Sequence, residues 1–231
     1  MAVSWPALAL LVRPIVVEMT TIGADSNTSI EVVNDRNVPV TVELTVDKLS
    51  VPERGAVETS ADSGDDFLIF PPQAIIAPGA RQNFRVRWVG EPEIDKTRLF
   101  MFTTSELPVA IPEGTTGVQL YYAVQSVVAV SAPNAKSDVK VRNVERAESG
   151  EDKGVLVTFV NEGDRHAFVS AAQLELRAGS TWKKNITEQE LGAAFGLGLV
   201  PAKGTRTLFL PVENVAADGA LSWTYTATAA R

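Results

Sequence analysis

The stretch VPVTVELTV, residues 38–46, has an apolar side chain at every second position, with Thr41, Glu43 and Thr45 between them. A period of two is typical of a half-buried antiparallel strand, in which one face packs on a core and the other meets water. The stretch NFRVRWV, residues 83–89, has the same pattern. The predicted core faces of the two strands are Val38, Val40, Val42, Leu44 and Val46, and Phe84, Val86 and Trp88. The sequence therefore predicts antiparallel sheets with one face on a core.

Strand patterns continue through the second half of the chain, bounded by Gly, Pro, Asn and Asp turns. They are GVLVTFVN (154–161), AFVSAAQLEL (167–176), RTLFLPV (206–212) and SWTYTATA (222–229). Only TEQELGAAFG, residues 187–196, favours a helix, and its two glycines weaken that prediction. The predicted fold class is all-β.

An internal repeat indicates how these strands are grouped. A strand ending in Asn34 is followed 45 residues later by the turn at Gly79, and a strand ending in Asn161 is followed 43 residues later by Gly204. Arg81 and Arg206 occupy matching positions after the two glycines. Two copies of one all-β unit explain this pattern, and each copy has the size of an immunoglobulin-like sandwich of about 100 residues.

The polar stretch SAPNAKSD, residues 131–138, predicts the boundary between the two copies. We therefore expect an N-terminal domain over 10–133 and a C-terminal domain over 134–231. Ala7 and Ala9 have the spacing of a signal-peptidase site, so residues 1–9 are interpreted as a signal-peptide remnant, with a first strand as the alternative.

The stretch VQLYYAVQSVVAV, residues 118–130, is apolar on both parities and would be the last strand of the first domain. A sandwich strand normally leaves one face to solvent, so the second face of this strand needs a cover. The second domain, a second copy of the chain or a foreign strand could supply it. At a sheet edge, the backbone of such a strand could also pair with another chain.

Composition excludes several functional classes. The net charge of −7 and the pI near 4.9 disfavour nucleic acid as a partner, because phosphate binding relies on clustered Lys and Arg. The chain has no Cys, which excludes disulfides and thiolate zinc sites. No apolar run is long enough to predict a membrane span.

Candidate sites for catalysis and metal binding are weak. The single histidine, His166, follows a turn and is expected at the surface or a strand edge. The carboxylates in DSGDD, residues 62–66, lack the ligand spacing of a calcium loop. Arg85 and Arg87 alternate with the core residues of their strand, so they are expected on an outer, solvated face, with ligand contact as the alternative. We expect no catalytic residue, no metal and no cofactor.

The stretch FLIFPPQAIIAPGARQNFRVRWVGEP, followed by TRLFMFTTSELPV, resembles the signature region of periplasmic pilus-assembly chaperones of the chaperone–usher pathway. IEVVNDRNVPVTVEL and VTFVNEGDRHAFVSAAQLEL resemble the Asn-containing strands of that family's two domains. The resemblance extends from about Leu11 to near the end of the chain. The short connection ELPVAIPEGTTG before the long strand is similar to the short-loop or archaic branch.

This resemblance implies two immunoglobulin-like domains set at an angle, a periplasmic location, and fimbrial subunits and an outer-membrane usher as partners. It also implies that the last strand of the first domain completes the fold of a subunit by donor-strand complementation. The donor residues would be Val118, Leu120, Tyr122 and Val124, or Tyr121 and Ala123 if the register differs by one residue.

One departure from the family pattern concerns the basic pair that holds the subunit's C-terminal carboxylate. The donor strand of the family would carry Lys or Arg where this sequence has Gln125, Ser126 and Val128. The candidate anchor for the carboxylate is therefore Arg13 with Gln125 and Ser126. Ala132-Pro133 replaces the usual Arg-Pro. The main alternative function is a cell-surface or adhesion-type immunoglobulin-like module, and an enzyme of unknown class is a weaker one. Self-association through the donor strand also stays open.

Overall fold

A computed structural model describes residues 10–61, 64–108, 120–179, 182–216 and 219–227 of the chain. These residues form two compact units. The first unit comprises the described residues up to Ser50, Thr59–Ile94 and Arg98–Pro133. The second unit comprises Val51–Glu58, Asp95–Thr97 and the described residues from Asn134 onward. Two short segments from the N-terminal half of the chain therefore belong to the second unit.

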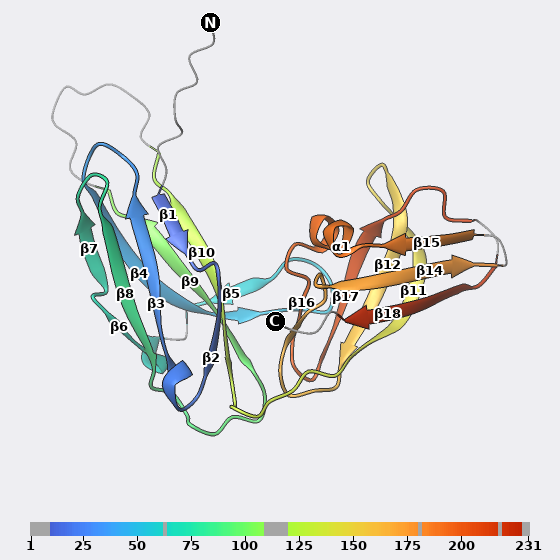
Figure 1. The fold of residues 1–231 in the computed structure, drawn as a ribbon, viewed down its shortest axis with the longest axis horizontal. Coiled ribbons are helices and arrows are strands. Elements are labelled where there is room, and N and C mark those ends of the chain that lie inside the picture. Colours follow the sequence, from blue (N-terminus) through green and yellow to red (C-terminus); the bar gives the residue numbers. More distant parts are fainter. Residues whose placement is uncertain (1–9, 62–63, 109–119, 180–181, 217–218, 228–231) are drawn as a thin grey trace, which may run out of the picture. The chain divides into compact units, whose positions relative to one another are not determined.

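The first unit is built from two sheets (Figure 1). One has the strand order β1-β3-β8-β6, and the other has the order β2-β10-β9-β4-β5, with β7 pairing with β4. The strands are β1 (Leu10–Arg13), β2 (Val16–Thr20), β3 (Asn27–Asn34), β4 (Val40–Ser50), β5 (Glu58–Ser60), β6 (Phe67–Phe70), β7 (Gln73–Ile76), β8 (Arg81–Trp88), β9 (Arg98–Glu106) and β10 (Ala123–Ser131). Short 3₁₀ turns cover Ala24–Ser26 and Gly64–Asp66.

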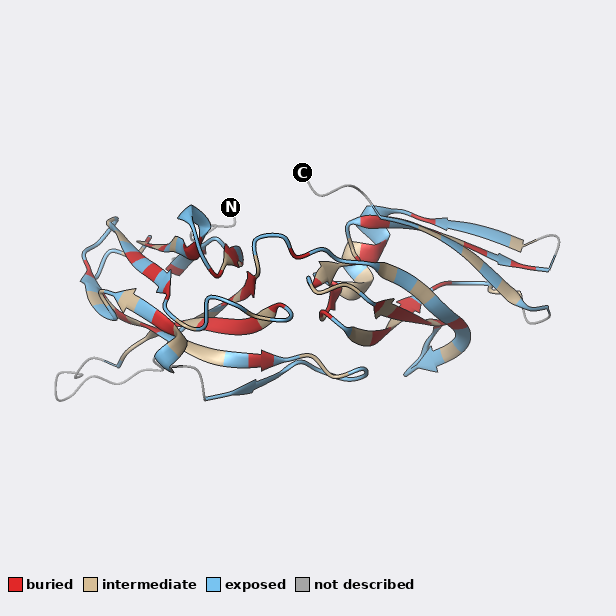
Figure 2. Ribbon diagram, turned by 90° about the horizontal axis from the view of Figure 1, so that it is seen from below, coloured by how far each residue is buried: buried red, intermediate tan, exposed pale blue. Residues whose placement is uncertain are grey.

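The core of the first unit lies between these sheets, and buried and exposed residues alternate along the strands (Figure 2). The predicted core face of β8 is confirmed, because Phe84, Val86 and Trp88 are all buried. In β4, Val40, Val42 and Leu44 are buried as predicted. Val38 is exposed instead, since the strand begins only at Val40.

The second unit has a three-stranded sheet β11-β12-β17, a second three-stranded sheet β15-β14-β18 and the short pair β13-β16. Its core cluster is separate from that of the first unit. The elements are β11 (Val139–Ser149), β12 (Asp152–Asn161), β13 (Ala167–Phe168), β14 (Ala172–Ala178), β15 (Trp182–Ile186), α1 (Glu188–Phe195), β16 (Leu199–Val200), β17 (Gly204–Pro211) and β18 (Leu221–Ala227). The all-β prediction with two immunoglobulin-like sandwiches is confirmed.

The predicted helix is present as α1, and its start is fixed by a capping box. The Thr187 hydroxyl accepts a hydrogen bond from the Glu190 backbone N–H, and the Glu190 carboxylate accepts one from the Thr187 backbone N–H. Leu191 anchors the helix in the core. Among the described residues, no helix has the length and apolar character needed to cross a bilayer.

The repeat predicted from the sequence is present, but its glycines and arginines do not match each other. Asn34 lies opposite Ala80, because the Asn34 N–H donates to the Ala80 carbonyl, whereas Asn161 pairs with Gly204. The residue with positive φ in each turn is therefore Gly79 in the first unit (φ 68°) and Lys203 in the second (φ 52°). Gly204 corresponds to Ala80, and the predicted match of Gly79 with Gly204 is off by one position.

Candidate functional site

The strand β10 is shorter than the sequence predicted. It begins at Ala123 rather than at residue 118, because its antiparallel neighbour β9 ends at Glu106 and offers no longer partner. Leu120, Tyr121 and Tyr122 precede the strand and are 68%, 43% and 42% exposed. Val118 lies outside the described residues. Three consecutive large apolar side chains directly before a strand of the first unit thus keep much of their surface exposed.

The two faces of β10 have different surroundings. Val128 and Val130 are fully buried in the core of the first unit, and Val124 packs against the same core. Ala123 and Gln125 are exposed on the opposite face. Since side chains alternate along an extended chain, Tyr122 and Leu120 continue the parity of Val124. The described members of the predicted donor set, Leu120, Tyr122 and Val124, thus share the side that fills the core further along the strand.

One edge of β10 is open at its beginning. The neighbouring strand β2 pairs with β10 only from Val127 to Ser131. The first backbone hydrogen bond on this side of β10 runs from the Val127 N–H to the Ile15 carbonyl. Among the residues that the structure describes, no strand pairs with the 123–126 part of β10 on this side. Because antiparallel backbone groups point alternately to either side, those of Ala123 and Gln125 face the open edge.

The three predicted anchor residues lie near this edge but differ in their surroundings. The Ser126 hydroxyl is buried and donates a hydrogen bond to the Pro14 carbonyl at 3.0 Å. This bond places the Arg13–Pro14 segment next to β10. The Arg13 side chain is 63% exposed and lies 3.6 Å from the Glu31 carboxylate. Gln125 is exposed. Ser126 therefore has an internal partner, whereas Arg13 and Gln125 can reach an external group.

An ion pair that the sequence analysis missed lies at the start of the same segment. Arg36, in the turn after β3, binds the Glu106 carboxylate with both terminal nitrogens, at 2.7 and 2.9 Å. Both side chains are largely buried, at 16% and 10% exposure. The Arg36 guanidinium also lies 5.0 Å from the centroid of the Tyr122 ring. The two charged residues are 70 positions apart, so no local sequence signal joins them.

The other predicted positions have ordinary structural surroundings. His166 is buried, not at the surface: its backbone N–H donates to the Thr97 hydroxyl, and its ring packs edge-on against Phe168. Arg85 and Arg87 are exposed on the outer face of β8, as predicted. Arg206 is buried against the carbonyls of Pro52 and Gly55. Burial lowers the pKa of Arg206 from its usual value.

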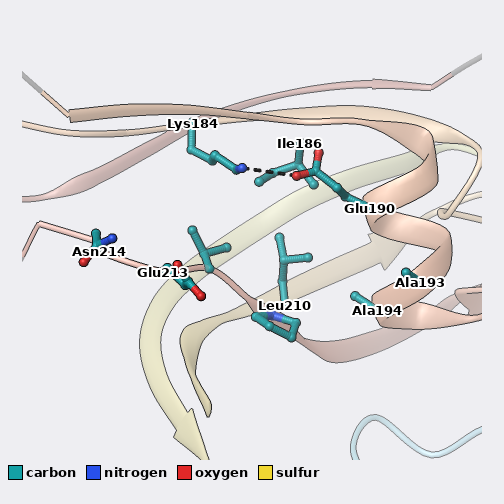
Figure 3. Close-up of a pocket in the computed structure, with 10 residues that line it drawn as sticks. Lys184, Ile186, Glu190, Ala193, Ala194, Leu210, Glu213 and Asn214 are labelled. Carbon is teal, nitrogen blue, oxygen red and sulfur yellow. Dashed lines mark ion pairs between the residues drawn. The ribbon is translucent and has the colours of Figure 1, made fainter.

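A cavity of about 530 Å³ lies in the second unit, between α1, β15 and the end of β17 (Figure 3). Its floor is apolar and includes Ile186, Leu210 and Val212, which belong to the core of that unit. Lys184 pairs with Glu190 at 3.1 Å across its rim. Within the described ranges, no group of His, Asp and Glu could hold a metal ion. The cavity is therefore an apolar hollow over the core of the second unit with one ion pair at its rim.

Comparison with known families assigns the chain to one of them. Residues 12–131 match the family described as pili and flagellar-assembly chaperone, PapD N-terminal domain. The match covers more than half of the chain and includes the first unit with β10, so the protein belongs to this chaperone family. No curated protein matched the sequence.

Solved structures agree on the fold over most of the chain. The SafB chaperone, solved with the SafA pilin of Salmonella enterica, is 18% identical with a TM-score of 0.55, covering 90% of this chain and 86% of that one. CsuC, solved with the tip subunit CsuE of archaic Csu pili of Acinetobacter baumannii, is 15% identical with a TM-score of 0.55, covering 94% and 97%. The class 5 fimbriae chaperone CfaA is 11% identical with a TM-score of 0.56, covering 95% and 100%.

Proposed function

We propose that this chaperone binds pilin-like fimbrial subunits by donor-strand complementation and delivers them to an outer-membrane usher. The donated segment runs from Val118 into β10, with Leu120, Tyr122 and Val124 as the described residues that enter the subunit. In this mechanism the incomplete subunit receives a strand from the chaperone, and main-chain hydrogen bonds together with alternate side chains in pockets hold the two together.

One observation carries this proposal: an exposed apolar segment leads directly into a strand whose edge is open. Leu120, Tyr121 and Tyr122 are large and solvent-exposed, and the adjoining 123–126 part of β10 pairs on one side only among the described residues. Burying such side chains is favourable, at about 25 cal/mol per Å² of apolar surface. Both the side chains and the backbone of this segment can therefore gain from a partner strand.

The register is the second part of the proposal. The parity of Leu120, Tyr122 and Val124 is supported by the buried positions of Val128 and Val130 in the same strand. The alternative set, Tyr121 and Ala123, would face the opposite side. We therefore favour the first set.

The comparisons support the partner class and the location. SafB was solved with a pilin and CsuC with a tip subunit, so pilin-like subunits are the cargo that we propose here. The family's periplasmic pathway supports a periplasmic location. The interpretation of residues 1–9 as a signal-peptide remnant falls outside the described residues and stays a prediction.

We further propose that Arg13 and Gln125 hold the subunit's C-terminal carboxylate. Arg13 supplies the charge, because its side chain is exposed and its contact with Glu31 is long at 3.6 Å. Gln125 supplies an exposed amide at the open edge. Ser126 contributes by holding the Pro14 carbonyl, and thereby Arg13, beside the strand.

The direct test is capture of a subunit during co-expression. The chaperone is expressed with small secreted subunits encoded beside its gene, and the co-purified complex is quantified. Replacing both Leu120 and Tyr122 with Glu should abolish the complex, because two charges would have to enter an apolar groove. Leu120→Ala alone should weaken it by roughly 2–5 kcal/mol, as for truncation in a packed core.

A matched control is Ile75→Glu, which changes an apolar residue of the same unit that is 75% exposed but lies on β7. This variant should leave capture unchanged. If the double Glu variant still yields the wild-type amount of complex, the segment is not the donor. The alternative of a structural immunoglobulin-like surface module would then gain support.

A further inference from the structure

Glu106 holds the backbone of Tyr122 from two sides. The Glu106 N–H donates to the Tyr122 carbonyl at 2.8 Å, and the Tyr122 N–H donates to Glu106 Oε2 at 3.4 Å. These contacts continue the β9–β10 ladder by one residue beyond the Ala123–Ser105 pair. Glu106 is the last residue of β9, so these bonds lie at the end of that strand.

Arg36 holds the same residue by its side chain. Its guanidinium lies 5.0 Å from the centroid of the Tyr122 ring, a distance at which a cation is attracted to the aromatic face. The same guanidinium makes the bidentate pair with Glu106, so one planar group meets both the carboxylate and the ring. Backbone and ring of Tyr122 are thereby fixed by two partners that also fix each other.

The pair is itself attached to the core of the first unit. The Arg36 backbone N–H donates to Asn34 Oδ1 at 3.0 Å. Asn34 is fully buried, and its amide donates to the carbonyls of Val38 and Ile76 at 2.8 and 3.0 Å. The backbone of Arg36 is therefore held in place, so its side chain can orient Tyr122.

We infer that Arg36 and Glu106 are positioning residues that set the register of the segment entering β10. A slip by one residue would turn every side chain to the other face, and it would remove both backbone bonds to Glu106 and the contact with Arg36. The pair thus favours the register in which Leu120, Tyr122 and Val124 share one side. The effect of the Arg36–Glu106 pair on subunit binding rests on the function proposed above.

Paired cysteines can measure this register, since the natural chain has none. The Glu106 N–H donates to the Tyr122 carbonyl, so the adjacent Ala123–Ser105 pair is of the non-bonded type, in which Cα atoms lie about 4.5 Å apart. This spacing suits a disulfide. Ser105→Cys with Ala123→Cys should therefore cross-link readily under mild oxidation when the register is kept.

Adding Arg36→Gln should lower the initial cross-linking rate between positions 105 and 123 at least threefold. Arg36→Lys keeps the charge but loses the planar fork, so it should restore the rate in part. The matched control is Arg81→Gln, which removes an exposed ion pair of the same unit, 3.5 Å from Glu31. This control should leave the rate unchanged.

A second cysteine pair separates positioning from general loss of stability. Met101→Cys with Val127→Cys joins the same two strands further along, where β2 also holds β10. Cross-linking of this pair should be the same with Arg36 and with Arg36→Gln. Equal cross-linking rates of the 105–123 pair with and without Arg36→Gln would overturn the inference. An equal fall in the cross-linking rates of the 105–123 and 101–127 pairs would also overturn it.

The effect of Arg36→Gln on subunit binding is measured separately, as the amount of co-purified subunit. Arg36→Gln should reduce co-purified subunit severalfold relative to Arg81→Gln. If the 105–123 rate falls while replacing Leu120 and Tyr122 with Glu leaves capture intact, the positioning role stands and the donor-strand proposal fails. If the double Glu variant abolishes capture but the 105–123 rate does not respond to Arg36→Gln, the positioning role fails alone.

Discussion

Asn34 and Asn161 make three matching side-chain hydrogen bonds in the two separate units, and the Asn161 oxygen also accepts one from the Asp138 N–H. Each is buried at the end of a strand, and each side-chain oxygen accepts from the backbone N–H two residues later. Each side-chain amide donates to the carbonyl four residues later, at 2.8 and 2.7 Å. Each amide also reaches a carbonyl about 40 residues on, that of Ile76 or Pro201. One asparagine thus ties two turns together in each sandwich.

The first prediction follows from this bonding. Asn34→Ala would leave the buried carbonyl of Ile76 and the N–H of Arg36 without their partner, so the first unit should lose about 2–3 kcal/mol of unfolding free energy. Asn161→Ala should do the same in the second unit. Hydrogen exchange with mass spectrometry, followed against denaturant, measures the two units separately.

Asparagine-to-aspartate variants supply the control. Asn34→Asp keeps the oxygen that accepts from Arg36 but loses the donor to the Ile76 and Val38 carbonyls. The same holds for Asn161→Asp. Each aspartate variant should still be destabilised, because a buried carboxylate would face carbonyl oxygens. Unchanged protection in the unit that carries the alanine variant would contradict the assigned role.

Local patterns in the sequence were sufficient for most of the fold. The alternation of Phe84, Val86 and Trp88 gave the buried face of β8, and the repeated asparagines indicated two similar sandwiches. The matching of Gly79 with Gly204 failed, because Lys203 adopts the positive φ that glycine provides in the other turn. A turn conformation can be kept by different residue types, so matching residue types alone misaligned the copies.

The candidate site could be predicted only in part. Alternation along the chain places Leu120, Tyr122 and Val124 on one side, and the length of apolar sequence suggested a strand from residue 118. The strand starts later, because β9 ends at Glu106. The contact of Arg36 with Glu106 and Tyr122 depends on how three distant segments meet, and a single sequence carries no signal for that.

The second prediction concerns the proposed carboxylate anchor. Arg13→Gln should weaken subunit binding about tenfold, the usual size for loss of one charge-assisted hydrogen bond. It should also reduce the dependence of affinity on salt, since a charge is removed from the interface. Arg81→Gln is a close control, because Arg13 and Arg81 both lie near the Glu31 carboxylate, at 3.6 and 3.5 Å. Dissociation rates at two salt concentrations provide the measurement.

For Ser126, a different result is expected. Ser126→Ala would leave the Pro14 carbonyl without its hydrogen bond, so the first unit should lose about 1 kcal/mol of stability. Equal effects of Arg13→Gln and Arg81→Gln on subunit dissociation would argue against an anchor at Arg13.

The third prediction is a loss of stability of the second unit in acid. The hydrogen bond from the Thr187 backbone N–H, and then that from Lys184, lower the pKa of the Glu190 carboxyl below its usual value. A lowered pKa in the folded state means that the stabilising contribution of Glu190 is present above the unfolded pKa of 4.5 and is lost as pH falls through the folded pKa. Glu190→Gln should flatten this part of the stability profile below about pH 4.

The helix cap allows a check at neutral pH. Thr187→Ala removes the hydroxyl that accepts from the Glu190 N–H, and it should cost about 1 kcal/mol. Thermal unfolding at pH 7 and pH 3.5 compares the two variants with the wild type. A Glu190→Gln variant with the same acid response as the wild type would show that other carboxylates dominate this range.

The fourth prediction concerns alkaline pH. Burial raises the pKa of Tyr225 to about 12, and its ring packs edge-on against Phe159, with centroids 5.6 Å apart. Because the folded pKa lies above the unfolded value of 10, the contribution of Tyr225 is complete below pH 10 and is lost as pH rises toward 12. Tyr225→Phe keeps the ring contact but cannot ionise, so the second unit of this variant should lose less stability between pH 9 and 11, by about 1–2 kcal/mol.

Denaturant midpoints at these two pH values, with hydrogen exchange to assign the unit, give the measurement. Parallel losses in the wild type and Tyr225→Phe would place the alkaline sensitivity elsewhere, whereas a smaller loss in Tyr225→Phe would tie it to the phenol beside Phe159.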